Sequence, residues 1–108
     1  MIKAVFFVKN DAFSGFEISG HSGAAPAGKD IVCAAVSAMT MLVVNTICGE
    51  YGKKAETTED ADTATVSFRL LEKDSASEGL IRSFYNELAA IEKDYPKNLK
   101  VDIQRLEQ

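Results

Sequence analysis

Two residues that can carry out nucleophilic chemistry lie close together in the first third of the chain. His21 is its single histidine, and Cys33, one of two cysteines, follows twelve residues later. Small and turn-forming residues fill most of the gap, and a long apolar segment begins at Ile31. A cysteine becomes a nucleophile when a neighbouring base or a positive environment favours its thiolate. Residues 20–35, GHSGAAPAGKDIVCAA, are therefore the first candidate for a functional site.

Asp30 predicts where Cys33 lies on the following helix. Aspartate is a preferred N-cap, and with Asp30 in that position Cys33 is the third residue of the first turn. Unpaired N–H groups and the positive end of the helix dipole favour a thiolate there, and the same N–H groups could serve as an oxyanion hole. The competing interpretation is a structural thiol, because cysteines at the head of an apolar helix commonly pack in the core.

Phosphate and metal binding fit the same stretch less well. Residues 23–30 match the pattern GxxxxGK, but the eighth position is Asp30, where a phosphate-binding loop needs a hydroxyl for magnesium. A metal site would have one histidine and two cysteines, and 15 residues of one helix separate Cys33 from Cys48 by about 22 Å. We therefore expect no metal and no cofactor. A redox-sensing thiol at Cys33 stays open as a further alternative.

Composition bounds the class of protein. The chain has 108 residues and a formal net charge of −4, which favours a single domain, residues 1–108, that does not bind nucleic acid. Two cysteines and an N-terminus without signal-peptide features predict a cytoplasmic protein with free thiols. The apolar segment 31–48 is interrupted by four polar residues, so we expect a buried core helix and no membrane association.

The first half of the chain predicts a hairpin followed by a helix. Residues 2–9 and 13–19 have the composition of strands, joined by turn residues at 10 and 11. The helix is expected to run from near Asp30 to Cys48, with Gly49 as its stop. Its apolar residues extend nearly all the way round, so we expect it at the centre of the fold, with Cys48 in the core.

The second half predicts another strand pair, a helix and a last strand. Residues 51–58 and 62–71 are expected to pair across a turn at residues 59–62. Ser75 and Glu78 form a capping-box pattern for a helix that ends at Tyr95-Pro96, and residues 99–103 alternate as a strand. The order β-β-α-β-β-α-β predicts an α+β fold, with two helices packed on a mostly antiparallel five-stranded sheet.

The stretch from Ser19 to Met39 resembles the ribosomal-processing cysteine proteases (Prp family) of bacteria. The resemblance is carried by Gly20-His21-Ser22-Gly23, by Gly28, and by DIVCAAVS at residues 30–37. The chain length and the order of elements are also similar. Members of the family often have a tyrosine where this chain has Ala24, so the loop between His21 and Cys33 is atypical.

The resemblance implies that His21 and Cys33 form a catalytic dyad. The implied enzyme is an endopeptidase of ribosome biogenesis that cleaves after an aromatic residue. Its implied substrate partner is the N-terminal extension of a large-subunit ribosomal protein, and its implied oligomeric state is a homodimer. A module on the same fold that binds the ribosomal protein or a peptide without cleaving it is the alternative.

Supporting roles follow from the positions of the neighbouring residues. Asp30 would cap the helix or orient His21, and Ser37, one turn beyond Cys33, would pack or bind the thiol. Gly20, Ser22, Gly23 and Gly28 would form a loop over the substrate or serve as plain turn residues.

Overall fold

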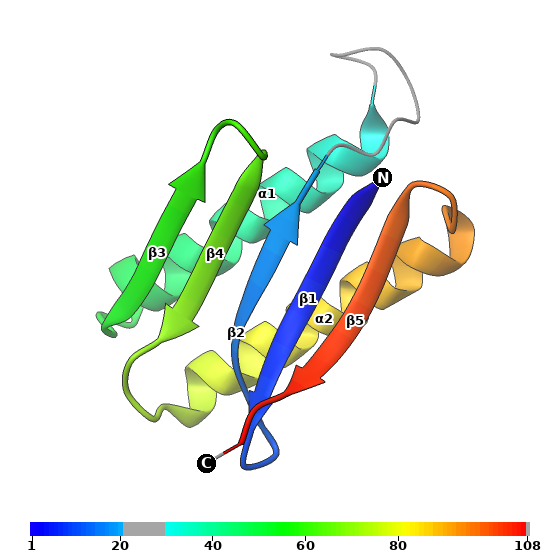
Figure 1. Cartoon of the computed structure of the whole chain (residues 1–108). Coiled ribbons are helices and arrows are strands. Elements are labelled where there is room, and N and C mark those ends of the chain that lie inside the picture. The colour runs from blue at the N-terminus through cyan, green and yellow to red at the C-terminus, as the bar shows by residue number, and fades with distance from the viewer. Residues whose placement is uncertain (21–29, 108) are drawn as a thin grey trace.

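The computed structural model describes residues 1–20 and 30–107. In this part of the chain, five strands, two α-helices and one π-helical segment follow one another (Figure 1). The elements are β1 (Ile2–Lys9), β2 (Ala12–Ser19), α1 (Ile31–Asn45), η1 (Thr46–Glu50), β3 (Ala55–Asp60), β4 (Thr65–Leu70), α2 (Ser75–Asp94) and β5 (Leu99–Arg105).

The strands form one sheet in the order β3-β4-β2-β1-β5. Three of the four pairings are antiparallel, and β1 pairs with β5 in parallel. Both helices lie on the same face of this sheet (Figure 1). The predicted α+β fold, with two helices on a mostly antiparallel five-stranded sheet, is therefore confirmed.

The predicted turn between the first two strands is a tight one. Asn10 and Asp11 have φ angles of 54° and 62°. Positive φ at both central residues is typical of the two-residue turns that match the twist of a hairpin, and Asn and Asp tolerate that region. The turn places β1 beside β2, with Phe6 opposite Phe16.

Aromatic side chains join the sheet to α2. Phe16 stacks on Phe68 of the neighbouring strand with 5.2 Å between ring centroids. Phe84 of α2 meets Phe6 and Phe16 edge to face, at 5.4 and 5.1 Å. These four rings are almost fully buried, and such pairs add stabilisation beyond the area they bury. The core therefore lies between the sheet and the two helices.

Helix α1 is less central than its composition predicts. Val32, Val36 and Val43 are buried, but one face remains in contact with solvent. On that face Ile31 is 63%, Met41 51% and Leu42 64% exposed. The prediction that this helix lies at the centre of the fold was wrong, because the sheet and α2 cover only its inner side and none of the described residues covers its outer side.

The predicted helix stop at Gly49 was also wrong. The α-helix ends at Asn45, and the chain continues through η1, where Tyr51 N–H donates to the carbonyl of Thr46 at 2.8 Å. The left-handed glycine that follows is Gly52, with φ +64°. Because the helical path extends beyond Gly49, β3 begins at Ala55 rather than at residue 51.

Cys48 was predicted in the core and is exposed. It lies in η1, beside the fully buried Ile47. A π-turn holds one more residue than an α-turn, so the face that a continued α-helix would bury is shifted by the wider turn. Among the described residues, both Cys33 and Cys48 are free thiols.

The second hairpin and the second helix begin at positions slightly different from those predicted. Strand β3 extends through Glu59 and Asp60, so the turn falls at residues 61–64, and β4 starts at Thr65. The N-cap of α2 is Asp74 rather than Ser75, since its carboxylate accepts from the backbone N–H of Ser77. Aspartate takes the capping role one residue earlier with the same geometry.

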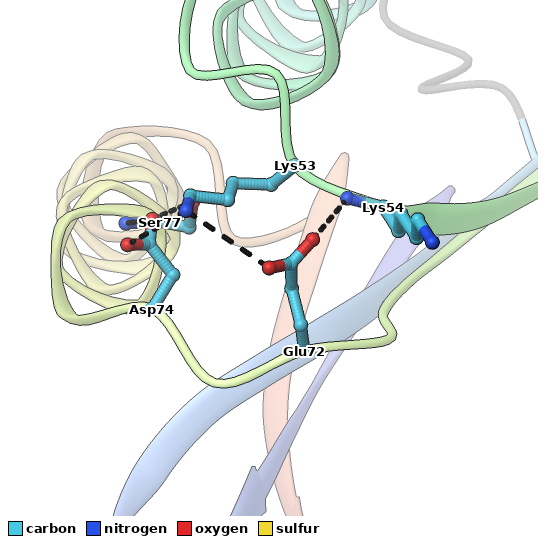
Figure 2. A network of polar contacts seen from close by, with 5 residues as sticks. All are labelled: Lys53, Lys54, Glu72, Asp74 and Ser77. Carbon is cyan, nitrogen blue, oxygen red and sulfur yellow. Dashed lines mark hydrogen bonds and ion pairs between the residues drawn. The ribbon is translucent and has the colours of Figure 1, made fainter.

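A polar network ties the segment after η1 to the start of α2 (Figure 2). Glu72 accepts from the backbone N–H of Lys54 at 2.8 Å, and its carboxylate lies 3.9 Å from the Lys53 ammonium. The same ammonium lies 3.9 Å from Asp74, which accepts from the Ser77 hydroxyl at 2.6 Å. Lys53 therefore lies between the carboxylate of Glu72 and that of Asp74, the cap of α2.

Candidate active site around Cys33

Cys33 lies in the first turn of α1, as predicted. Asp30 is the N-cap, with an extended backbone, and its Oδ1 accepts from the Cys33 N–H at 2.9 Å. The backbone carbonyl of Asp30 accepts from the Ala34 N–H at 3.1 Å. Cys33 is thereby fixed as the third residue of the helix and is partly exposed to solvent.

The cap changes which groups could bind an oxyanion. The N–H of Cys33 donates to the Asp30 side chain, so the expectation that the first-turn N–H groups are free does not hold for Cys33 itself. Ile31 and Val32 precede it in the same turn, and an α-helix offers no internal acceptor to its first N–H groups. These two N–H groups are the first-turn donors that remain for such a role.

Cys33 opens into a cavity of about 490 Å³ between α1 and one end of the sheet. On the helix side, Cys33, Val36, Ser37, Thr40 and Met41 line it, at the spacing of a single helical face. Ile2, Ile18 and Val66 form an apolar floor on the sheet side. A cavity of this size, mostly apolar with a few polar groups, is typical of a ligand-binding site.

Gly20 lines the same cavity and directly follows β2. Its φ is +85°, and a Cβ built there would lie 2.5 Å from the carbonyl oxygen of Met1. Its N–H donates to the carbonyl of Ala64 at 3.2 Å. Glycine is required here by both the backbone conformation and the close approach of Met1, so plain backbone geometry explains this residue.

The hydroxyl groups on the helix side differ in their bonding. Thr40 is buried, and its hydroxyl donates to the carbonyl of Val36 at 2.7 Å. Ser37 is exposed, and within the described residues its hydroxyl has no hydrogen-bond partner. Ser37 therefore faces the same cavity as Cys33 with a donor and acceptor that a bound ligand can use.

Four of the predicted site residues fall outside the described part of the chain. They are His21, Ser22, Gly23 and Gly28. Cys33, Asp30, Ser37 and Gly20 are described, and all but Asp30 line the one cavity. The dyad of His21 with Cys33, and the role of the loop, therefore remain predictions.

Glu59 and Asp60, at the end of β3, also line this cavity, and sequence reasoning missed them. The available signal was the strand alternation, since a residue opposite Val66 on the next strand faces the same side of the sheet. That signal could not be used without the register of β3 against β4.

The described residues also bear on three other functional classes, namely metal binding, phosphate binding and membrane insertion. In ranges 1–20 and 30–107 no group of three His, Cys, Asp or Glu side chains could hold a metal ion. The Asp30 carboxylate takes the helix N-terminus that a phosphate loop would offer to an anion. By length and composition Ile31–Glu50 is apolar enough to cross a membrane, but its inner residues Val36, Val43 and Ile47 pack in the core.

A partly exposed thiol at a helix N-terminus that opens into a mostly apolar cavity is an arrangement that cysteine hydrolases use. The family model described as cysteine protease Prp matches residues 1–100. The chain therefore belongs to the cysteine protease Prp family, as the resemblance implied. No curated protein matches it.

Solved structures share the fold over nearly the whole chain. The essential ribosomal processing protease Prp from S. aureus, in complex with a covalently linked product peptide, has a TM-score of 0.90 at 23% identity, over 96% of this chain and all of its own. Its complex with a substrate peptide gives 0.84 at 22% identity, over 96% and 100%. A protein from Streptococcus mutans gives 0.83 at 24% identity, over 98% and 96%.

Proposed function

We propose that this protein is a cysteine endopeptidase that removes the N-terminal extension of a large-subunit ribosomal protein, cleaving after an aromatic residue. Membership of the cysteine protease Prp family supports the protease activity. The S. aureus protein with the same fold is a ribosomal processing protease that binds a substrate peptide, which supports the substrate class. The apolar floor of the cavity beside Cys33 suits an aromatic side chain.

The observation that carries the proposal is that Cys33 and Gly20 line one cavity. Gly20 is covalently joined to His21, the proposed base, and Cys33 carries the proposed nucleophile. Gly20 and Cys33, which are thirteen positions apart in the sequence, thus line the same cavity from the end of the sheet and from α1. Nucleophile and base must meet at the substrate for this chemistry.

The proposed reaction follows the usual course of cysteine proteases. The Cys33 thiolate attacks the scissile carbonyl, and the N–H groups of Ile31 and Val32 stabilise the oxyanion. Protonated His21 gives its proton to the leaving amine, which leaves a thioester on Cys33. Neutral His21 then takes a proton from a water molecule as that water attacks the thioester. The acid product leaves and loses its proton to solvent, and the Cys33 thiolate and protonated His21 are restored.

A cleavage assay tests this function. A peptide with the ribosomal protein's extension should be cut by wild type, and Cys33→Ala and His21→Ala should each lower the rate by about a thousandfold or more. Cys48→Ala is the matched control, because Cys48 is an exposed cysteine on the same helical segment away from the cavity. Equal cleavage by Cys33→Ala would remove the nucleophile. Binding without cleavage by wild type would support the non-catalytic assembly module instead.

We propose further that the protein is a homodimer joined through the outer face of α1. Ile31 and Leu42 expose apolar side chains there, and residues 31–49 include no charged residue. A second copy would cover this face. Leu42→Glu should convert a dimer to a monomer in light scattering, and Leu71→Glu, at an exposed leucine outside α1, should not. A dimer that survives Leu42→Glu would contradict the interface.

The proposed place of action is the cytoplasm, where ribosomes are assembled, with no binding to nucleic acid or membrane. The net charge of −4 supports the expectation that the protein binds neither nucleic acid nor membrane, because nucleic acid and anionic lipid repel an acidic protein. Cell fractionation should recover the protein with soluble components at high salt. Recovery with membranes would contradict it.

A further inference from the structure

We propose that Glu59 selects a positively charged side chain of the substrate close to the scissile bond. This inference rests on the proposed function, since it takes the cavity beside Cys33 as the site of the peptide. It goes beyond that function because it assigns a specificity-determining residue on β3, an element that carries neither of the proposed dyad residues nor any residue of the proposed substrate loop.

The strand register places Glu59 on the helix-facing side of the sheet. Glu59 lies opposite Val66 of β4, and Val66 lies opposite Ile18 of β2. Residues directly opposite one another in an antiparallel pair face the same side. Glu59 therefore continues the row of Ile18 and Val66 that forms the apolar floor of the cavity, and its carboxylate stands where that floor ends.

Among the described residues, the charges that line the cavity are of one sign. Glu59 and Asp60 are the two charged residues among those that line it within the described chain. Asp60 is engaged in the following turn, because its Oδ1 accepts from the Asp62 N–H at 3.0 Å. For Glu59, no ion pair or side-chain hydrogen bond is formed within residues 1–20 and 30–107.

Glu56 shows what an acidic residue on the same strand does when it has a partner. It is three residues earlier, opposite Arg69, and its carboxylate lies 3.5 Å from the Arg69 guanidinium. Alternation along β3 directs Glu56 to the face of the sheet without helices, away from the cavity. The two glutamates thus differ in both face and pairing. Glu59, which lines the same cavity as Cys33, is the one whose carboxylate can bind a ligand there.

A ligand that fills the cavity will approach this carboxylate. When a substrate side chain covers the apolar floor, water is removed from around the Glu59 carboxylate. A lysine or arginine of the substrate nearby then makes a charge-assisted contact with this carboxylate. Because Glu59 is exposed in the free protein, solvent screens the pair and the gain is modest. We expect a preference of roughly two- to fivefold for a lysine over a glutamine, reduced by added salt.

The test uses peptides that contain the aromatic cleavage position with a lysine or a glutamine at successive positions on each side. At the preferred position, the kcat/KM ratio of lysine to glutamine peptide should exceed one for wild type and fall to one for Glu59→Gln. Glu59→Lys should reverse the preference, so that a further peptide with glutamate at that position is cleaved with a higher kcat/KM than the lysine peptide. Glu56→Gln, which removes the same charge from the same strand, should leave the ratio unchanged.

Peptide binding to Cys33→Ala, measured by fluorescence anisotropy, separates this inference from the proposed function. A lysine preference in binding that Glu59→Gln abolishes supports the inference even if wild type cleaves nothing. Equal lysine-to-glutamine ratios in wild type at every position would overturn it, even if cleavage is rapid. An equal loss of preference in Glu56→Gln would also overturn it, since a general charge effect would then explain the result.

Discussion

At the scale of single residues, Asp30 decides how Cys33 is presented. Its carboxylate accepts from the Cys33 N–H at 2.9 Å, which fixes the first turn and the position of Cys33 within it. The bond also places a negative group beside the proposed nucleophile, where the helix dipole alone would favour a thiolate. Asp30 is thus a cap by observation, and its action on His21 remains a prediction.

Two substitutions of Asp30 separate these roles. Asp30→Ala should lower the free energy of unfolding by about 1 kcal/mol, and Asp30→Asn by much less, because asparagine also caps helices. Urea unfolding measures both. If Asp30 acts as a cap alone, Asp30→Asn keeps cleavage close to the wild-type rate. A large loss of cleavage in a stable Asp30→Asn would show that the charge orients His21.

The residues of the site differ in how far the sequence could predict them. Asp30 and Cys33 follow from local capping chemistry, which depends on neighbours within one turn. Glu59 depends on the register of β3 against β4, which short-range patterns do not determine. Cys48 was misplaced because an α-helical period was extended through a segment that adopts a wider turn.

At the scale of elements, the way the first helix ends determines where β3 begins. The π-helical segment η1 carries the chain past Gly49, and Gly52 supplies the left-handed conformation that ends it. The start of β3 moves to Ala55 as a result. Strand β3 carries Glu59, so this ending sets which residues reach the cavity.

Two glycine substitutions test this ending. Gly52→Ala should lower the free energy of unfolding by about 1–2 kcal/mol, because a Cβ is unfavourable at φ +64°. Gly49→Ala should be neutral or stabilising, since its φ is not positive and no atom lies within 4 Å of a Cβ built there. Thermal or urea unfolding gives both values. The opposite order would restore Gly49 as the helix stop.

At the scale of the whole molecule, one sheet carries both helices on one face, and the polar network of Figure 2 joins the segment after η1 to the start of α2. The Ser77 hydroxyl and N–H, together with the Lys53 ammonium, hold the pKa of Asp74 below its ordinary 3.8. Fold class and element order could be predicted because they follow from the spacing of hydrophobic residues along the chain. The network could not, because it joins Lys53 to residues that approach it only in the folded chain.

The lowered pKa of Asp74 makes stability depend on acid. The ionised carboxylate is favoured in the folded state, so its contribution is fully present above about pH 4 and is lost as the pH falls through the folded pKa. Wild type should therefore lose its advantage over Asp74→Asn below pH 4 in urea unfolding. An advantage independent of pH would contradict the charge-based explanation and leave capping alone.

If Cys33 is the nucleophile of a peptide-cleaving site, a reactive substrate analogue should label its sulfur covalently, and identifying the labelled residue tests this role. A peptide chloromethyl ketone with an aromatic residue before the reactive group should alkylate the Cys33 sulfur with loss of chloride. Peptide mass mapping should then find the label on Cys33 and not on the more exposed Cys48. Labelling of Cys48 alone, or labelling of Cys33 that His21→Ala leaves equally fast, would contradict the account.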